Sequence, residues 1–162
     1  MSAGRVGMGY DVHAFAEERP LVLGGVTVRE RGGLAGYSDA DVISHAVADA
    51  LLGAAGLGDL GTHFSADAVK EGVSSLEILT RTAALLAESG FSIVNVDATV
   101  VIQQVRMAPY REEMVTRVAA ALGVDRARVS VKATTTDHLG LTGRNEGVAG
   151  LAVALVDKSA GP

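Results

Sequence analysis

The fold is decided by residues 36–64, which read GYSDADVISHAVADALLGAAGLGDLGTHF. Ser38 and Asp39 are good N-cap residues, and the apolar residues that follow recur at helical spacing. We therefore predict a helix that begins near residues 39–41 and ends near Gly56, with Gly58 and Gly61 keeping it from continuing. The rest of the chain is arranged around this helix.

One face of the predicted helix is polar. Asp41, His45 and Asp49 are spaced four residues apart, so a helix projects all three from one side. Two interpretations are open: a solvated face that contains one stray histidine, or a metal ligand at His45 whose neighbouring carboxylates serve the metal or its substrate. We favour the second, because the rest of the helix is rich in Ala, Val and Leu.

The composition indicates a small protein with closely packed elements. A chain of 162 residues is long enough for one domain with a sizeable core. Hydrophobic residues make up 48% of it, yet only 4% are aromatic and 20 are glycine, so we expect further apolar surface to be buried in a homo-oligomer. A net charge of −5 argues against nucleic acid or an anionic membrane as a partner.

Two absences from the sequence narrow the chemistry and the location. There is no cysteine, so a metal would have to be bound by histidine and carboxylate. The N-terminus lacks the long apolar core of a signal peptide, and no run reaches the roughly 18 apolar residues of a membrane span. We expect a cytoplasmic protein.

A possible metal-binding pair lies near the N-terminus. Residues 5–15 are predicted to form a strand that runs into a loop, and Asp11 and His13, two apart, then point to the same side. With His45 they would make a set of two histidines and one aspartate. That is the ligand count of a catalytic zinc with one open position.

The remaining chain alternates between strands and helices without a regular βαβ order. We predict a hairpin over 20–28 that turns at Gly24–Gly25, loops over 30–36 and 62–72, helices over 74–89 and 110–122, and strands over 91–103 and 129–135. Residues 148–156 are apolar almost throughout and should be buried on most sides, as a helix or a strand. The predicted fold class is α+β: a single domain over 1–162 whose mixed β-sheet carries its helices mainly on one face.

Three threonines at the end of the strand predicted over 129–135 are followed by an aspartate. Thr134, Thr135 and Thr136 precede Asp137, and hydroxyls and backbone N–H groups at such a junction are good ligands for phosphate oxygens, with Lys132 and Arg144 nearby in sequence. The alternative is an ordinary strand that ends in a turn.

Taken together, several motifs resemble the family of 2-C-methyl-D-erythritol 2,4-cyclodiphosphate synthases. The resemblance runs from about residue 5 to residue 156, and the order and spacing of the motifs make it specific. The motifs that carry it are GYDVHAF (9–15), SDADV (38–42) with His45, DALLG (49–53), GDLG (58–61), NVDAT (95–99), KATTTD (132–137) and GRNEG (143–147).

The resemblance implies an enzyme of non-mevalonate isoprenoid biosynthesis. Such an enzyme is a homotrimer with active sites at subunit interfaces, and it converts 4-diphosphocytidyl-2-C-methyl-D-erythritol 2-phosphate to the cyclic diphosphate with release of CMP. Asp11, His13 and His45 would bind Zn²⁺ or another divalent ion, and Asp137 would bind Mg²⁺ or Mn²⁺ together with the substrate diphosphate.

The resemblance also assigns the other site residues. Tyr37 and Thr135 would act near the transition state. The residues that would bind substrate are Ser38, Asp59, Gly61, Phe64, Asp67, Arg106, Met107, Ala108, Ala133, Thr134 and Thr135, with the loop 104–108 coming from a neighbouring subunit. The residues that would lie at the trimer axis are Tyr10, Leu141, Arg144 and Glu146.

The chain departs from the family pattern at four places. Tyr37 replaces a histidine, and a phenol donates a hydrogen bond but carries no positive charge near neutral pH. Residues 65–68 keep one acid where the family has two, Val105–Arg106 replaces a Pro-Lys pair, and Asp137 replaces a glutamate. None of these changes touches the predicted zinc ligands.

Two other functions are compatible with the sequence. One is a non-catalytic, metal-bound trimer that binds a nucleotide or an isoprenoid diphosphate, which the Tyr37 and loop departures motivate. The other is a zinc-dependent hydrolase that uses metal-bound water, although no general base is evident beside the predicted ligands.

Overall fold

The structure is a computed structural model that describes residues 4–158. Five strands form one sheet in the order β4–β1–β7–β5–β6. Their bounds are β1 Arg5–Ala16, β4 Gly33–Leu34, β5 Phe91–Val101, β6 Val129–Thr134 and β7 Gly147–Lys158. Strands β5 and β6 are parallel and the other neighbours are antiparallel, which confirms the predicted mixed sheet.

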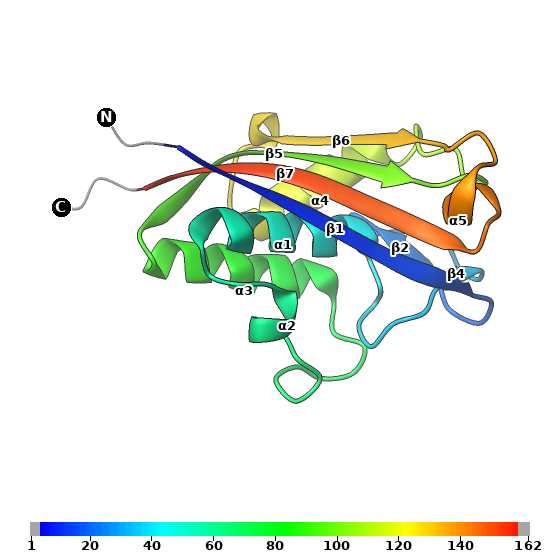
Figure 1. Ribbon diagram of the computed structural model, residues 1–162, viewed down its shortest axis with the longest axis horizontal. Coiled ribbons are helices and arrows are strands. Elements are labelled where there is room, and N and C mark those ends of the chain that lie inside the picture. Colours follow the sequence, from blue (N-terminus) through cyan, green and yellow to red (C-terminus); the bar gives the residue numbers. More distant parts are fainter. Residues whose placement is uncertain (1–3, 159–162) are drawn as a thin grey trace.

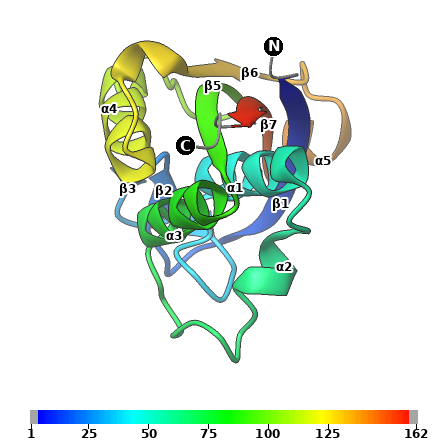
Figure 2. The ribbon, with the colours of Figure 1, turned by 90° about the vertical axis from the view of Figure 1, so that its left-hand side faces the viewer.

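Three long helices cover one face of this sheet (Figure 1, Figure 2). They are α1 (Val42–Ala55), α3 (Ser75–Glu88) and α4 (Arg111–Leu122). The short elements are the hairpin strands β2 (Leu21–Leu23) and β3 (Val26–Arg29), the helical turns α2 (Leu60–His63) and α5 (Gly140–Gly143), and the 3₁₀ turn η1 (Arg126–Arg128). The helices thus lie mainly on one face, as predicted.

The central helix starts two to three residues later than the N-cap candidates Ser38 and Asp39 suggest. The N-cap of α1 is Asp41, whose carboxylate accepts hydrogen bonds from the N–H groups of Ile43 and Ser44. Asp41 therefore lies outside the helix, in extended conformation, and the helix ends at Gly56 in the left-handed conformation with φ of 74°.

Helix α1 lies directly on the backbone of strands β1 and β7. Glycines at 7, 9 and 150 make this approach possible, since a Cβ at any of them would lie within 2.2 Å of a carbonyl oxygen of α1. A side chain at these positions would push the helix away from the sheet. The abundance of glycine in the sequence is thus explained in part by helix–sheet contact.

Smaller differences from the predicted elements occur in the loops and in α3. The predicted loop 30–36 contains the two-residue strand β4, and the start of the predicted loop 62–72 belongs to the helical turn α2. In α3 the buried residues are Ser75, Ile78, Leu79, Thr82 and Leu86. The spacing of the apolar residues predicts that Ala87 is also buried, but it is exposed. The hairpin turn at Gly24–Gly25 is confirmed, with both residues at positive φ.

The apolar segment 148–156 belongs to strand β7, and from Leu151 onward only one side of it is buried within the chain. Ala152, Ala154 and Val156 face the helices, whereas Leu151 and Val153 are 36% and 47% exposed. The prediction that this segment is buried on most sides is therefore wrong for the single chain. Side chains alternate along a strand, so the outward positions have no layer above them.

The outward face of the sheet continues onto strand β1. Val6, Met8 and Tyr10 are exposed by 68%, 71% and 54%, and Met8 and Tyr10 pair with Val153 and Leu151 in the register of β1 and β7. We call these five residues the outer apolar face. The outer apolar face is therefore a candidate interaction surface.

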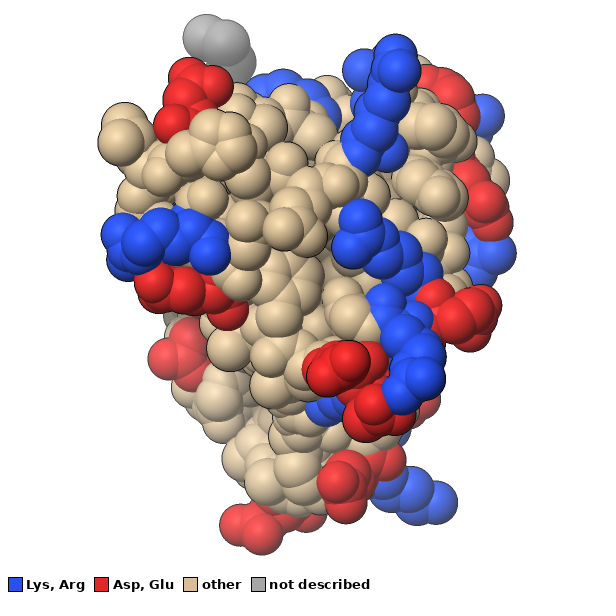
Figure 3. All heavy atoms as spheres, turned by 90° about the vertical axis from the view of Figure 1, so that its right-hand side faces the viewer, with Lys and Arg blue, Asp and Glu red and all other residues tan. Residues whose placement is uncertain are grey.

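Charges of both signs are mixed on the end of the molecule that carries α5 and β4 in Figure 1. Figure 3 views that end and shows Lys and Arg side chains next to Asp and Glu side chains, with uncharged surface between them. Across residues 4–158, no helix has the length and apolar character needed to cross a membrane.

Candidate active site

Strand β1 and helix α1 bring three of the predicted ligands together. Asp11 Oδ2 lies 3.1 Å from His13 Nε2 and 2.9 Å from His45 Nδ1. These atoms all lie within 4.8 Å of one another, so Asp11, His13 and His45 form a group that could hold a metal ion. The prediction that Asp11 and His13 of one strand converge with His45 of the helix is confirmed.

The ring nitrogens that face away from this group have protein partners. His13 Nδ1 donates a hydrogen bond to the Ala35 carbonyl oxygen at 2.5 Å. His45 Nε2 lies 3.0 Å from both Ser38 Oγ and Ser75 Oγ. A neutral imidazole held in this way at one nitrogen presents the lone pair of the other, so the donor set suits a divalent cation.

The electrostatics of the group also favour a cation. Burial acts to raise the pKa of Asp11, but the hydrogen bonds and charges of His13 and His45 outweigh it and hold that pKa well below its usual value. The hydrogen bond with Asp11 raises the pKa of His13. Asp11 is therefore an anion at any ordinary pH and can serve as a ligand.

The other two residues of the predicted polar stripe have different roles. The Asp41 carboxylate is buried and accepts hydrogen bonds from the N–H groups of Gly24 and Gly25 as well as from the first turn of α1. The Asp49 carboxylate accepts from Leu60 N at 2.9 Å. The hypothesis that both carboxylates serve His45 or its substrate is therefore wrong for Asp41, which is fully buried and ties α1 to the β2–β3 turn. Asp49 ties α1 to α2, and a contact with substrate stays a prediction.

A cavity of about 250 Å³ adjoins the histidines. Its lining combines polar and apolar side chains: His13, Tyr37, Ser38, His45, Leu60, Gly61, Phe64, Val69, Val73 and Ile78. Four of the predicted substrate or transition-state residues, Tyr37, Ser38, Gly61 and Phe64, are thus beside the metal group. The Tyr37 hydroxyl donates to the carbonyls of Ala66 and Val69 at 3.3 and 3.4 Å, which links it to the predicted loop over 62–72.

Two other predicted substrate residues lie at the edge of this region. Asp59 is the N-cap of α2 and accepts hydrogen bonds from the Thr62 hydroxyl and N–H at 2.8 and 2.9 Å. Those two hydrogen bonds lower the pKa of Asp59. Asp67 is exposed in the turn that follows α2. Both carboxylates remain accessible to a ligand.

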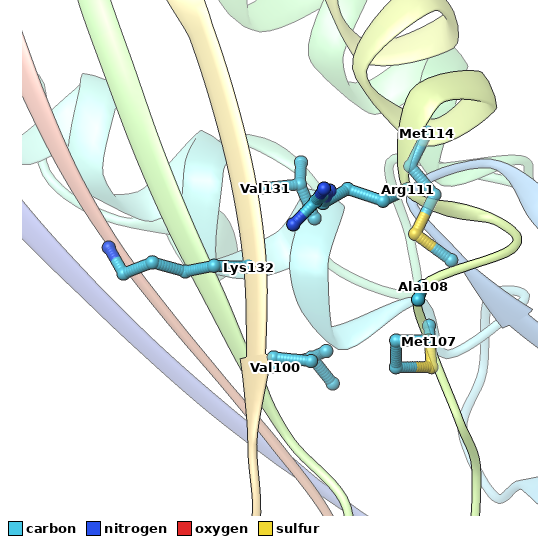
Figure 4. A pocket seen from close by; sticks show the side chains of 8 residues that line it. Val100, Met107, Ala108, Arg111, Met114, Val131 and Lys132 are labelled. Atoms are coloured by element: carbon cyan, nitrogen blue, oxygen red, sulfur yellow. The ribbon is translucent and has the colours of Figure 1, made fainter.

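A second cavity, of about 240 Å³, lies between α4 and the strands β5 and β6 (Figure 4). Its lining residues are Val100, Met107, Ala108, Arg111, Met114, Val131, Lys132 and Ala133. Three of the predicted substrate residues, Met107, Ala108 and Ala133, are therefore together. Figure 4 shows the Lys132 side chain pointing away from Met107 and Met114, and its ammonium pairs with Asp97 instead.

The threonine segment forms a compact exposed turn. Thr135 Oγ1 donates to Asp137 Oδ1 at 3.4 Å and accepts from Asp137 N at 3.3 Å, and Asp137 has φ of 50°. Thr134 and Arg106 are also exposed. Lys132 and Arg144, which we expected to balance phosphate charge, are instead bound to Asp97 and Glu146 within the chain.

The residues predicted for the trimer axis lie on β1 and around α5. Tyr10 belongs to the outer apolar face, and Leu141 is 37% exposed on α5. Arg144 donates to Glu146 Oε1 at 2.6 Å, in the segment that leads into β7. Their role at an axis stays a prediction.

Three groups next to the metal ligands were missed by the sequence reasoning. They are the Ala35 carbonyl, the Ser75 hydroxyl and the Asp39 carboxylate. The Ala35 carbonyl accepts a hydrogen bond from His13, the Ser75 hydroxyl contacts His45, and the Asp39 carboxylate contacts the Ser75 hydroxyl. Ser75 comes 30 residues after His45 and reads in the sequence as the start of a helix. The Ser-Asp pair at 38–39 was the only available signal, and it also fits a helix cap.

A family model described as the YgbB family matches residues 4–157. The chain belongs to the YgbB family. Proteins named 2-C-methyl-D-erythritol 2,4-cyclodiphosphate synthase are similar to it over nearly their whole length. The one from Pelotomaculum thermopropionicum is 53% identical over 156 residues, 96% of each chain, and the one from Geobacillus kaustophilus is 50% identical over 156 residues, 96% of this chain and 99% of that one.

Solved structures of YgbB relatives have the same fold. The bifunctional IspDF from Campylobacter jejuni matches with a TM-score of 0.93 and 38% identity, over 98% of this chain and 43% of that one. The Plasmodium falciparum IspF, solved as a complex with CDP, matches with a TM-score of 0.85 and 29% identity over 99% of both chains.

Proposed function

We propose that this chain is a 2-C-methyl-D-erythritol 2,4-cyclodiphosphate synthase. It would convert 4-diphosphocytidyl-2-C-methyl-D-erythritol 2-phosphate to the 2,4-cyclodiphosphate and release CMP. The observation that carries the proposal is the convergence of Asp11, His13 and His45 within 4.8 Å, in a chain of the same extent as relatives that bear this name.

We assign Zn²⁺ to the Asp11, His13 and His45 group. The ligand atoms would be Asp11 Oδ2, His13 Nε2 and His45 Nδ1, a histidine-rich set of three that suits zinc with an open position. Asp137 would hold Mg²⁺ or Mn²⁺ jointly with phosphate oxygens, since a lone carboxylate does not strip magnesium of its waters. Divalent cations in these places would neutralise charge on the phosphorus under attack.

The chain itself would position the reacting groups. The nucleophile is the 2-phosphate of the substrate, so the protein needs no nucleophilic side chain and contributes mainly alignment. Ser38, Gly61 and Phe64 would hold the erythritol end in the cavity beside the histidines. Asp59 and Asp67 would contact it from the α2 side, and Tyr37 and Thr135 would donate hydrogen bonds to phosphate oxygens.

The cavity beneath α4 suits a nucleotide. Val100, Val131 and Met114 give it apolar walls of the kind on which a flat base packs, and Ala133 and Ala108 leave room for one. A relative from Plasmodium falciparum was solved with CDP. For this chain we infer a cytidine site here, with Arg106 and the hydroxyls of Thr134 and Thr135 at its exposed end.

A homotrimer would unite the two cavities. They share no lining residue, and one substrate has to reach both the metal group and the nucleotide site. The outer apolar face supplies a surface for association. We therefore propose that the nucleotide site of one subunit completes the metal site of the next, with Tyr10, Leu141, Arg144 and Glu146 near the axis. We propose a cytoplasmic location.

Incubation of the purified protein with the diphosphocytidyl substrate and Mg²⁺ tests the proposal. CMP together with the cyclic diphosphate is the expected result. CMP with an open phosphate would indicate a hydrolase, and no turnover would indicate a binding protein, and either outcome would overturn the proposal. His45→Ala serves as the inactive control.

A further inference from the structure

A chain of hydrogen bonds extends from His45 to a carboxylate outside the metal group. His45 is 8% exposed, and its Nε2 lies 3.0 Å from Ser75 Oγ. Ser75 is fully buried, and its hydroxyl donates to Asp39 Oδ1. Hydrogen bonds thereby connect His45 of α1, Ser75 at the start of α3 and Asp39 of the loop before α1, in that order.

The direction of these hydrogen bonds is fixed by the carboxylate at their end. An ionised carboxylate only accepts, so the Ser75 hydroxyl proton points to Asp39. The lone pairs of Ser75 Oγ are then left for His45 Nε2, which has to carry a proton in order to donate. In a neutral ring the lone pair consequently lies on Nδ1, the nitrogen that is 2.9 Å from Asp11.

Asp39 is held rigidly enough to act as an anchor. Its Oδ2 accepts a hydrogen bond from Ser75 N at 2.9 Å, at the first residue of the 14-residue helix α3, where the helix dipole favours a negative charge. Asp41 N donates to Oδ1 at 3.3 Å, and Asp39 N donates to the Val73 carbonyl at 3.2 Å.

Ser38 makes the same distance to His45 Nε2 but differs in its other partner. Ser38 Oγ accepts from Ala40 N at 3.1 Å, and it lines the cavity beside the histidines. Its hydroxyl proton is not committed to a carboxylate by any contact among residues 4–158, so Ser38 can donate to a ligand. Ser75 is the neighbour that fixes the histidine.

We propose that Asp39 and Ser75 are positioning residues for His45, setting its tautomer and ring orientation so that Nδ1 presents its lone pair to the metal. The inference rests on the proposed metal site and deepens it. Partners of this kind next to a metal-bound histidine change metal affinity by about 10- to 100-fold. A hydroxyl between the histidine and the carboxylate also couples the N-terminus of α3 to the metal group.

The proposed roles of Asp39 and Ser75 are tested by the zinc affinity of the full-length protein. The affinity is measured on metal-free protein by competition with a chromophoric chelator. Ser75→Ala and Asp39→Asn should weaken zinc binding by about 10- to 100-fold, and Ser75→Thr, which keeps the hydroxyl, should restore most of it. Ser74→Ala is the matched control. It removes the N-cap hydroxyl of the same helix, which accepts from Leu76 N at 3.3 Å, and should leave zinc affinity unchanged.

A second measurement separates positioning from a general loss of structure. In ¹H–¹⁵N spectra of the zinc-bound protein, the Nε2 proton of His45 should exchange slowly in wild type and in Ser74→Ala, and rapidly in Ser75→Ala. Equal zinc affinity in Ser75→Ala and Ser74→Ala, or an unchanged Nε2 proton in Ser75→Ala, would overturn the inference. Tight zinc binding by His45→Ala would instead overturn the proposed metal site itself.

Discussion

The Cα of Gly9 on β1 faces the Ala46 carbonyl of α1 so closely that a Cβ at Gly9 would lie 1.9 Å from that oxygen. The contact is backbone against backbone, one residue along the helix from His45 and two along the strand from Asp11. The separation of helix and strand that brings the ligands together therefore depends on a missing side chain.

Gly9→Ala should both destabilise the protein and weaken metal binding. The added methyl has to displace α1 from the sheet, an overpacking that costs about 1–3 kcal/mol or more. Thermal unfolding and zinc titration measure the two effects. Gly53→Ala is the control: Gly53 is exposed within α1, a Cβ there meets nothing within 4 Å, and the change should stabilise the helix by about 1 kcal/mol at most.

Asp11→Ala and His45→Ala should each abolish tight zinc binding and turnover together, because two ligands leave the coordination incomplete. Elemental analysis of the purified variants measures the metal content. Asp49→Asn is the matched control on α1, since the amide oxygen can still accept from Leu60 N. One zinc per chain in the purified His45→Ala protein would contradict the assignment.

Charges placed on the outer apolar face should prevent assembly. Met8 and Val153 are cross-strand partners, and Met8→Asp with Val153→Asp puts two like charges opposite each other on the surface that we expect to be buried between subunits. Light scattering should give about three times the 16.5 kDa chain mass for wild type and the chain mass for the variant. Ala84→Asp on the exposed side of α3 should remain trimeric, and a monomeric wild type would refute the proposal.

Asp137→Asn should keep zinc and lose magnesium-dependent turnover, because the change removes the charge without changing the size of the side chain. Asparagine also tolerates the left-handed conformation that Asp137 adopts, with φ of 50°. Asp137→Glu restores the residue typical of the family and should retain the magnesium response. Titration of Mg²⁺ against activity compares the three proteins, and an unchanged response in Asp137→Asn would place the second cation elsewhere.

The buried Asp41 should make stability depend on pH. Burial, with a further contribution from Asp39, raises the pKa of Asp41 above the unfolded value of 3.8. The folded state therefore binds a proton more tightly than the unfolded state, and this stabilisation is complete below 3.8 and is lost as the pH rises through the raised pKa. Urea unfolding of metal-free wild type and Asp41→Asn should show that the stability of the wild type rises relative to that of the variant as the pH is lowered from neutral toward 3.8.

Local sequence signals predicted most helices and strands well. They did not predict the role of a side chain that contacts an element distant in the sequence. The helix 42–55 could be located because a cap, a periodic apolar run and Gly56 agree. The polar stripe misled because Asp41 lies just outside the helix and Asp49 reaches α2. Periodicity describes directions around an axis, and it does not say which neighbouring element lies there.

The metal ligands could be named from the sequence, but their surroundings could not. Asp11 and His13 share one side of a strand by their spacing, and His45 stands out on an otherwise apolar helix. The resemblance to a family then implied the same three ligands. The Ser75 hydroxyl reaches His45 only because α3 packs beside α1, which no short motif encodes. The apolar segment 148–156 was likewise expected to be buried, but the exposed Val6 and Met8 of β1 that lie on the same face were not located from the sequence.

The separate positions of the two cavities within one chain have a genetic consequence. In the proposed trimer each chain contributes to two different active sites, so a chain that is defective in both cavities but still assembles would spoil two of the three sites of any trimer it joins. Alleles of that kind would be dominant over the normal copy. Two chains that are each defective in a different cavity would, when expressed together, restore some intact sites between them.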